Sequence, residues 1–184
     1  MDVQMGQRSE DFALRMPGAC RQAELLDGSA VVIRDLTPSD AEQVMGLYKS
    51  LDADERYLRF FTMNPRDLPA WARAVTDCSD TQRAIGCFES DRLLGVANYV
   101  VSKASNEAEM AVTVAHGHHM RGVGTLLLHR LGAIAKANGL QFLVAQVLTV
   151  NSPMLEVLSE SGWPFERKRD GTVGTFRVDL SEIR

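Results

Sequence analysis

Two groups of residues in this sequence combine types and spacing that could do chemistry. The first is a glycine-rich loop, Arg121-Gly122-Val123-Gly124-Thr125, between an expected strand and an expected helix. Unpaired N–H groups at a helix N-terminus, together with the helix dipole, favour an anion such as phosphate. Glycines let the anion approach the backbone, and Arg121 adds a charge-assisted donor. A plain turn into a helix has the same pattern, so the position of the loop carries the argument.

The second group is a pair of carboxylates, Glu107 and Glu109. They lie two residues apart in an expected strand, so both side chains project from the same face. A carboxylate there can take the proton that an amine must lose before attacking an acyl group. Holding a lysine amine neutral at pH 7 costs about 4–5 kcal/mol, because its reference pKa is about 10.4. Glu109 lies deeper in the apolar run and is the better candidate, although both residues also fit a solvated strand surface.

Hydrophobic periodicity predicts the elements that would position these groups. We expect strands at 30–34, 84–88, 93–101, 107–114 and 141–148, the last covered on both faces, and a hairpin around Asp170-Gly171. Helices are expected from Ala41 to Leu51, at 52–61, around 71–75, from Gly122 to Gly139 and at 152–161. Residues 1–22 are predicted to form a flexible tail and residues 23–184 one domain.

Composition excludes several classes of protein. The formal net charge of −4 over 184 residues argues against a general nucleic-acid partner. The sequence contains no apolar stretch of about 20 residues and no apolar signal core, so we expect a cytoplasmic protein without a membrane partner. Cys20, Cys78 and Cys87 show no CxxC spacing, and a loop holds the other candidate ligands, His116, His118 and His119. With no partner at ligand spacing, no metal is expected, and Cys87 is interpreted as a buried thiol.

The strand Val112-Thr113-Val114 followed by His119-Met120-Arg121-Gly122-Val123-Gly124 resembles the acyl-CoA site of the GNAT family of N-acetyltransferases. That family's pattern is Gln/Arg-x-x-Gly-x-Gly/Ala, and His119 departs from it. The resemblance extends from about residue 30 and implies an α/β fold, a central mixed, mostly antiparallel sheet flanked by helices. It also implies acetyl-CoA as cosubstrate. The strand would form hydrogen bonds with the pantetheine arm, the loop would bind the pyrophosphate, and Asn151 would contact the cofactor near its middle. The implied cofactor-binding residues are Val112, Thr113, Val114, His119, Met120, Arg121, Gly122, Val123, Gly124, Thr125 and Asn151.

Three further segments are similar to bacterial protein lysine acetyltransferases of the Pat type: Ala108-Glu109-Met110-Ala111-Val112, Tyr57-Leu58-Arg59-Phe60-Phe61 and Asn151-Ser152-Pro153-Met154-Leu155. This resemblance implies Glu109 as general base and a protein acceptor that presents a lysine, such as an acyl-CoA synthetase. Many family members carry a tyrosine that acts as an acid toward the leaving thiolate. In this sequence that position is occupied by Leu158.

Two alternatives stay open. In the first, the acceptor is a small-molecule amine instead of a protein lysine. In the second, the chain is a non-catalytic domain that senses acyl-CoA. For the aromatic pair Phe60-Phe61, core packing is favoured over a place in the acceptor groove.

Overall fold

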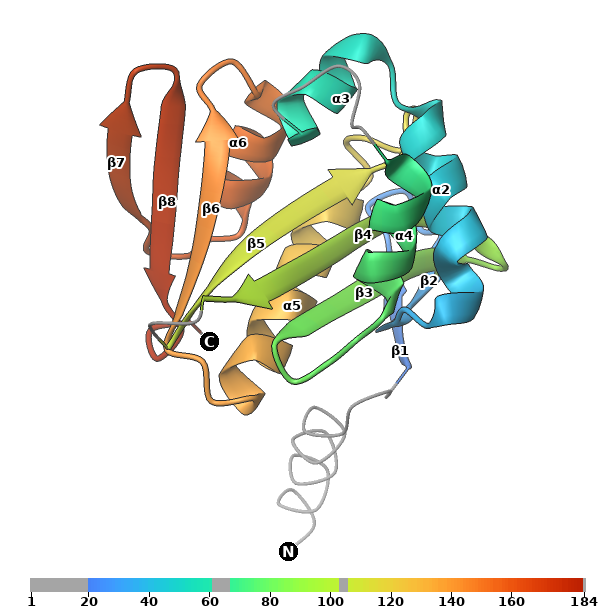
Figure 1. Ribbon diagram of the computed structural model, residues 1–184, viewed down its shortest axis with the longest axis horizontal. Coiled ribbons are helices and arrows are strands. Elements are labelled where there is room, and N and C mark those ends of the chain that lie inside the picture. Colours follow the sequence, from blue (N-terminus) through green and yellow to red (C-terminus); the bar gives the residue numbers. More distant parts are fainter. Residues whose placement is uncertain (1–19, 61–66, 103–105, 184) are drawn as a thin grey trace, which may run out of the picture.

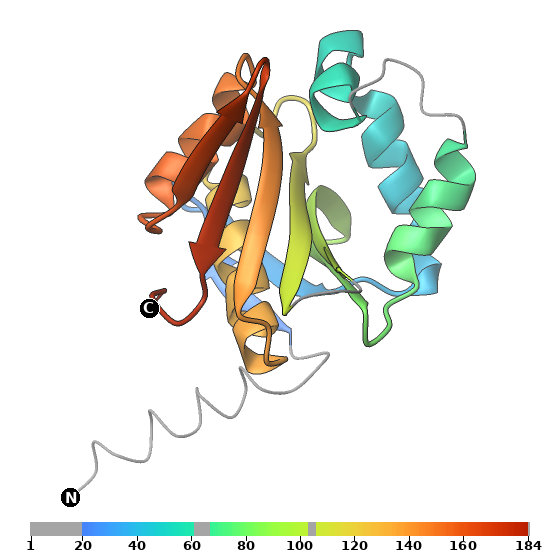
Figure 2. The ribbon, with the colours of Figure 1, turned by 60° about the vertical axis from the view of Figure 1, so that its left-hand side comes forward.

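The computed structural model describes residues 20–60, 67–102 and 106–183, which form an eight-stranded sheet with helices on both faces (Figures 1 and 2). The strands are β1 (Arg21–Glu24), β2 (Ala30–Asp35), β3 (Gln82–Glu89), β4 (Arg92–Val101), β5 (Glu107–Val114), β6 (Phe142–Leu148), β7 (Glu166–Asp170) and β8 (Val173–Asp179). The helices are the 3-10 helix η1 (Pro38–Asp40), α2 (Ala41–Ser50), α3 (Ala53–Phe60), α4 (Leu68–Thr76), α5 (Val123–Ala137) and α6 (Ser152–Glu160).

The strands lie in the order β1-β2-β3-β4-β5-β6-β8-β7, and every neighbouring pair is antiparallel except β5 and β6. The predicted fold class, an α/β fold with a mixed, mostly antiparallel sheet, is therefore confirmed. The sequence analysis missed β1, because this short edge strand is polar and lacks an apolar alternation. It begins at Arg21, so the predicted tail boundary at residue 22 is wrong by two residues. Residues 1–19 of the predicted tail lie outside the described ranges.

Apolar residues pack into a core on each face of the sheet. On one face, α2 and α4 bury residues such as Val44, Tyr48 and Val75 against β3 and β4. On the other, the long helix α5 buries Leu127 and Leu131 in the larger core. Figure 2 shows the two helical layers with the sheet between them. The predicted helices and their glycine ends are confirmed: α5 is followed by a glycine with φ +80° and α6 by one with φ +68°.

The sheet splits between its two parallel strands. β5 pairs with β6 only from Glu107, opposite Phe142, to Glu109, opposite Val144. Beyond that point β5 stays paired with β4 as far as Val114, while β6 stays paired with β8. The two strands therefore diverge, as Figure 1 shows, and residues of both diverging strands line a cavity.

This split corrects the prediction for β6. The apolar run 141–148 was expected to be covered on both faces, but burial alternates along β6, and Gln146 is exposed. Leu143 and Val147 face the core, whereas Val144 is only half-buried. The apolar composition did not reveal that one face of β6 is partly left open.

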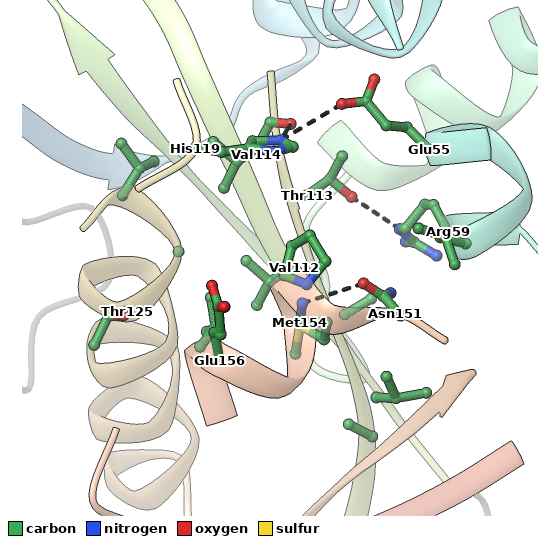
Figure 3. A pocket seen from close by; sticks show the side chains of 18 of the residues that line it. Glu55, Arg59, Val112, Thr113, Val114, His119, Thr125, Asn151, Met154 and Glu156 are labelled. Atoms are coloured by element: carbon green, nitrogen blue, oxygen red, sulfur yellow. Dashed lines mark hydrogen bonds and ion pairs between the residues drawn. The ribbon is translucent and has the colours of Figure 1, made fainter. Parts of the chain in front are cut away.

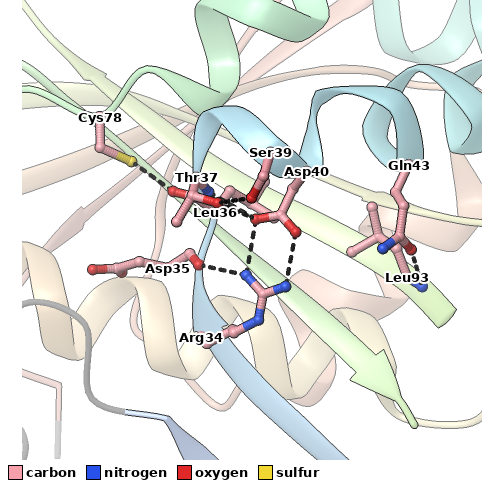
Figure 4. Close-up of polar contacts among 9 residues, drawn as sticks. All are labelled: Arg34, Asp35, Leu36, Thr37, Ser39, Asp40, Gln43, Cys78 and Leu93. Atoms are coloured by element: carbon pink, nitrogen blue, oxygen red, sulfur yellow. Dashed lines mark hydrogen bonds and ion pairs between the residues drawn. The ribbon is translucent and has the colours of Figure 1, made fainter. Parts of the chain in front are cut away.

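A polar cluster fixes the connection from β2 to α2 (Figure 4). Arg34 donates to both carboxylate oxygens of Asp40, each at 2.8 Å, and the Thr37 N–H also donates to that carboxylate at 2.8 Å. The Arg34 guanidinium lowers the pKa of Asp40 to about 2. The cluster satisfies the start of the helical segment and ties it to the sheet.

None of the helices in the described ranges is long and apolar enough to cross a membrane.

Phe60 packs against the rings of Tyr48 and Trp71, in agreement with the predicted core packing. The other member of the aromatic pair, Phe61, lies outside the described residues. Burial raises the pKa of the Cys87 thiol to about 11, in agreement with its interpretation as a buried thiol.

Candidate active site

A cavity of about 410 Å³ occupies the opening between β5 and β6. Its walls also include α3, the N-terminal turn of α5 and one side of α6 (Figure 3). All but one of the predicted site residues line it: Glu109, Val112, Thr113, Val114, His119, Met120, Gly122, Val123, Gly124, Thr125 and Asn151. The exception is Arg121. The predicted site residues thus come together from three separate segments of the sequence: β5, the loop that leads into α5 with the first turn of that helix, and the start of α6.

The backbone of β5 offers hydrogen-bonding groups to this cavity. The Ala115 N–H, just after β5, donates to the Leu94 carbonyl of β4. Because backbone groups of successive residues point to opposite edges of a strand, Thr113 also faces β4. Val112 and Val114 face the other edge, where β6 has diverged. Of the three predicted pantetheine contacts, Val112 and the Val114 N–H are thus available for strand-like bonding, whereas the Thr113 backbone pairs with β4 and the Val114 carbonyl contacts His119.

The loop before α5 adopts left-handed backbone conformations at Met120, with φ +62°, and at Gly122, with φ +84°. Gly122 caps α5, and the helix begins at Val123 with N–H groups that lack intrahelical acceptors. These groups lie at the cavity wall, where the dipole of a fifteen-residue helix favours an anion. A strained non-glycine residue such as Met120 is typical of functional loops.

Gly124 has a packing role besides the close approach of a ligand that the glycine pattern predicts. A Cβ built on it would lie 2.7 Å from a methyl group of Val157 in α6. The missing side chain therefore lets α5 and α6 pack closely at the cavity wall. Close helix contact, in addition to close approach of a ligand, explains the second glycine of the loop.

Arg121 lies outside the cavity lining, and its guanidinium is held by two carboxylates. Its Nε lies 2.6 Å from Asp27 and its Nη2 lies 2.7 Å from Glu89. These bonds lower the pKa of Asp27 to about 2 and also lower that of Glu89. Arg121 also lies 2.7 Å from a ring nitrogen of His118. The predicted role of Arg121 is donation to a phosphate; its contacts in the structure instead fix the loop to the β1–β2 and β3–β4 turns.

His119, the one departure from the family pattern, closes one end of the β5 edge. Its Nε2 lies 3.2 Å from the Val114 carbonyl oxygen and 3.7 Å from a carboxylate oxygen of Glu55. The same carboxylate lies 3.0 Å from His116, and it raises the pKa of that imidazole. Through these contacts the helix α3 is joined to the loop that precedes the cofactor site.

Glu55 also belongs to a group of potential metal ligands with Asp52 and His116, whose atoms lie within 4.8 Å of one another. The sequence analysis found no acidic partner for the histidines, because Asp52 and Glu55 are remote in sequence. Their contacts have a structural explanation: the backbone N–H of each acid donates to the carboxylate of the other at the start of α3. This reciprocal cap and the ion pair with His116 account for the grouping.

The two candidate bases are in different surroundings. Glu109 is exposed and lines the cavity. Glu107 lies outside the lining, and its carboxylate accepts a 2.8 Å hydrogen bond from Nε of Arg177 in β8. Of the two, Glu109 is therefore the carboxylate placed to act on a bound ligand.

Asn151 begins α6 and lines the same cavity. Its side-chain oxygen accepts a 3.1 Å hydrogen bond from the Met154 N–H, which caps the helix (Figure 3). The side chain also carries an amide NH₂, a donor for a ligand in the cavity that Asn151 lines. Leu158, about two helical turns after Asn151, is 1% exposed and belongs to the core. It supplies no proton donor to the site.

The sequence analysis did not assign a role to a polar cluster on the face of β5 that carries Glu109. Arg59 donates through Nε to the Thr113 hydroxyl at 3.0 Å and through Nη2 to the Asn98 side-chain oxygen at 3.4 Å. The buried Tyr48 hydroxyl donates to the same threonine at 3.2 Å. Polar residues inside apolar segments, such as Asn98 within β4, were the available signal.

Comparison with known proteins decides the family. Residues 30–163 match the family described as "Acetyltransferase (GNAT) domain". The chain belongs to the GNAT family. Because that match covers well over half of the chain, this GNAT protein is an acetyl-CoA-dependent acetyltransferase, as the cofactor loop predicted.

Individual relatives agree with this assignment. The GNAT chain is 25% identical to "Acetyltransferase PA5475" of Pseudomonas aeruginosa over 174 residues, 92% of this chain and 93% of that protein. Its fold is similar to the GNAT domain of S. lividans PAT, with a TM-score of 0.79, 24% identity and coverage of 87% and 96% of the two chains. A GNAT acetyltransferase from Salmonella typhimurium, yncA with acetyl-CoA, gives a TM-score of 0.66 at 16% identity, over 82% and 94% of the chains.

Proposed function

We propose that this acetyltransferase moves acetyl from acetyl-CoA to the ε-amine of a lysine in a protein, with Glu109 as general base. The observation that carries the proposal is the position of Glu109. It is a carboxylate in the cavity, on the strand whose unpaired edge at Val112 and at the Val114 N–H faces the cavity, where the pantetheine arm would bind. The neighbouring acid, Glu107, is engaged by Arg177.

The proposed reaction is a direct transfer. The neutral amine nitrogen attacks the acetyl carbonyl carbon, the C–N bond forms, the C–S bond breaks and CoA leaves as thiolate. Glu109 accepts the proton that the amine nitrogen loses, directly or through a water molecule. Leu158 offers no acid for the thiolate, but a thiol with a pKa near 8.5 leaves at pH 7 for only about 2 kcal/mol. The base therefore contributes more to the rate than a leaving-group acid would.

Two features support a protein acceptor. The segments around Tyr57, Glu109 and Asn151 resemble those of Pat-type lysine acetyltransferases, and the similar S. lividans structure is a domain of a protein named PAT. An acyl-CoA synthetase that presents a lysine is the first acceptor to test. Cavity residues come from β5, β6 and α3, so an extended lysine side chain can approach Glu109 from the face covered by α3.

The test is incubation of the enzyme with radiolabelled acetyl-CoA and, in parallel, a cell lysate, a purified acyl-CoA synthetase and a panel of small amines. Label in a protein band, mapped to a lysine by mass spectrometry, supports the proposal. Label only in a small amine supports a small-molecule acetyltransferase. Acetyl-CoA binding measured by calorimetry, without transfer to any acceptor, supports a sensing domain.

A further inference from the structure

Arg59 is fixed in the cavity by neutral partners. It lies in the last turn of α3, and two of its five N–H donors bind the buried side chains of Thr113 and Asn98. Its guanidinium also lies 5.2 Å from the ring centroid of Phe60 and 5.6 Å from that of Trp71. These contacts hold the charged group in one place, and among the described residues they use only two of its N–H donors.

The charge of Arg59 lacks a counter-ion in the described parts of the chain, where no carboxylate forms an ion pair with it. Among the described residues that line the cavity, it is also the only arginine or lysine. Glu55, which shares the cavity, is paired with His116 and His119. A partly buried guanidinium is more stable when an anion completes its hydrogen bonds, so the site favours a ligand that brings one.

The anion is expected on the acceptor rather than on the cofactor. The phosphate-binding loop at the start of α5 lies on the other side of Val112 and Thr113 from Arg59, as Figure 3 shows with Thr125 marking the helix. Arg59 contacts the face of β5 that also carries Glu109, four residues before Thr113. That separation is about 13 Å along a strand, and the Arg59 guanidinium also binds Asn98, whose strand partner Ala111 is two residues from Glu109.

We propose that Arg59 forms a carboxylate subsite, and that the preferred acceptor carries a carboxylate near the reacting amine. This proposal rests on the proposed function, because it assumes that the amine is presented to Glu109. Two sources have the required chemistry: an acidic side chain next to the acceptor lysine in a protein, and the α-carboxylate of a free amino acid. A planar guanidinium suits either, because it can donate two parallel hydrogen bonds to the two oxygens.

The test compares matched ligands by equilibrium binding to the full chain with CoA present, so that no transfer occurs. One pair is a short fluorescent peptide with a single lysine flanked by glutamate and the same peptide with glutamine. The other pair is lysine and lysinamide. We expect the carboxylate-bearing member of at least one pair to bind about tenfold more tightly, as for a hydrogen-bonded charge at a partly buried site. The pair that shows the difference identifies the source.

Substitutions then assign the preference to Arg59. Arg59→Gln is expected to remove the tenfold ratio by weakening only the carboxylate ligand, and Arg59→Lys to retain part of it. Arg56→Gln is the matched control, because Arg56 lies on the same helix outside the cavity. Unchanged affinity for acetyl-CoA shows that each variant is folded. If Arg59→Gln does not fold, the loss of the wild-type ratio at high salt replaces it.

Equal binding within both pairs, binding of none of the four ligands, or a ratio that survives Arg59→Gln overturns the subsite. The proposed function is judged separately, by replacing CoA with labelled acetyl-CoA. A carboxylate ligand that binds through Arg59 but receives no label contradicts the proposed transfer and leaves the subsite intact.

Discussion

Glu107 and Glu109 lie on the same face of β5, but only Glu109 lines the cavity. The Glu107 carboxylate is 2.8 Å from Nε of Arg177, a residue of β8. β5 and β6 separate immediately after Glu109, so this residue lies where the sheet opens. Two acids that are nearly equivalent in sequence thus have different tasks: one joins strands, and the other faces the ligand.

Replacing Glu109 with glutamine is expected to lower kcat about 10²–10⁴-fold, because the amine loses its proton acceptor. The affinity for acetyl-CoA, measured by calorimetry, should stay close to that of the wild type, since the substitution removes no contact with the loop. Glu107→Gln is the matched control on the same strand and should keep most of the turnover. Full activity of Glu109→Gln, or an equal loss in both variants, would contradict the assignment of the base.

Gly124→Ala is expected to destabilise the protein by about 1–3 kcal/mol, because the new methyl group would collide with Val157. Since α5 and α6 both line the cavity, displacement of either helix should also weaken acetyl-CoA binding. Denaturant unfolding and calorimetry measure the two effects. Gly46→Ala is the control: a Cβ there meets nothing within 4 Å in α2, so the same substitution should raise stability by up to about 1 kcal/mol.

Asp40→Asn tests the cluster at the start of the helical segment. Arg34 lowers the pKa of Asp40 from 3.8 to about 2, so the ionised form stabilises the fold. This contribution, about 1–2 kcal/mol, is present above pH 4 and is lost as the pH falls toward 2. The variant should therefore be less stable than the wild type at pH 7, with the difference shrinking in acid. Urea unfolding at a series of pH values measures this; a constant difference down to pH 2 would argue against the ion pair.

The three cysteines should react with an alkylating reagent in order of exposure. Cys20 is exposed, whereas Cys87 is fully buried, and burial raises its pKa to about 11. Thiolate is the reactive form, so at pH 8 we expect rapid modification of Cys20 and none of Cys87 until the protein unfolds. Mass spectrometry of peptides after timed alkylation distinguishes the sites. Early labelling of Cys87 would show that the β3–β4 core opens readily.

The sequence alone determined most of the local structure. The helix that follows Gly122 and ends before Gly139, the hairpin turn at Gly171 and the strand that carries Glu109 all depend on nearby residues. Hydrophobic period, left-handed glycines and turn residues act over a few positions, so they are readable from the order of amino acids. The glycine loop also identified the cofactor through its resemblance to the GNAT family.

Only the tertiary structure decided which side chains meet. Arg121 forms ion pairs with Asp27 and Glu89, which lie in two other segments of the chain. Arg59 donates a hydrogen bond to Thr113, which is 54 positions away in the sequence. The sequence did not predict β1, the divergence of β5 from β6, or the engagement of Glu107 by β8. Each of these depends on strand register and on packing between elements remote in sequence. Such contacts are set by the assembled sheet, because no local pattern records which distant charge or strand lies opposite.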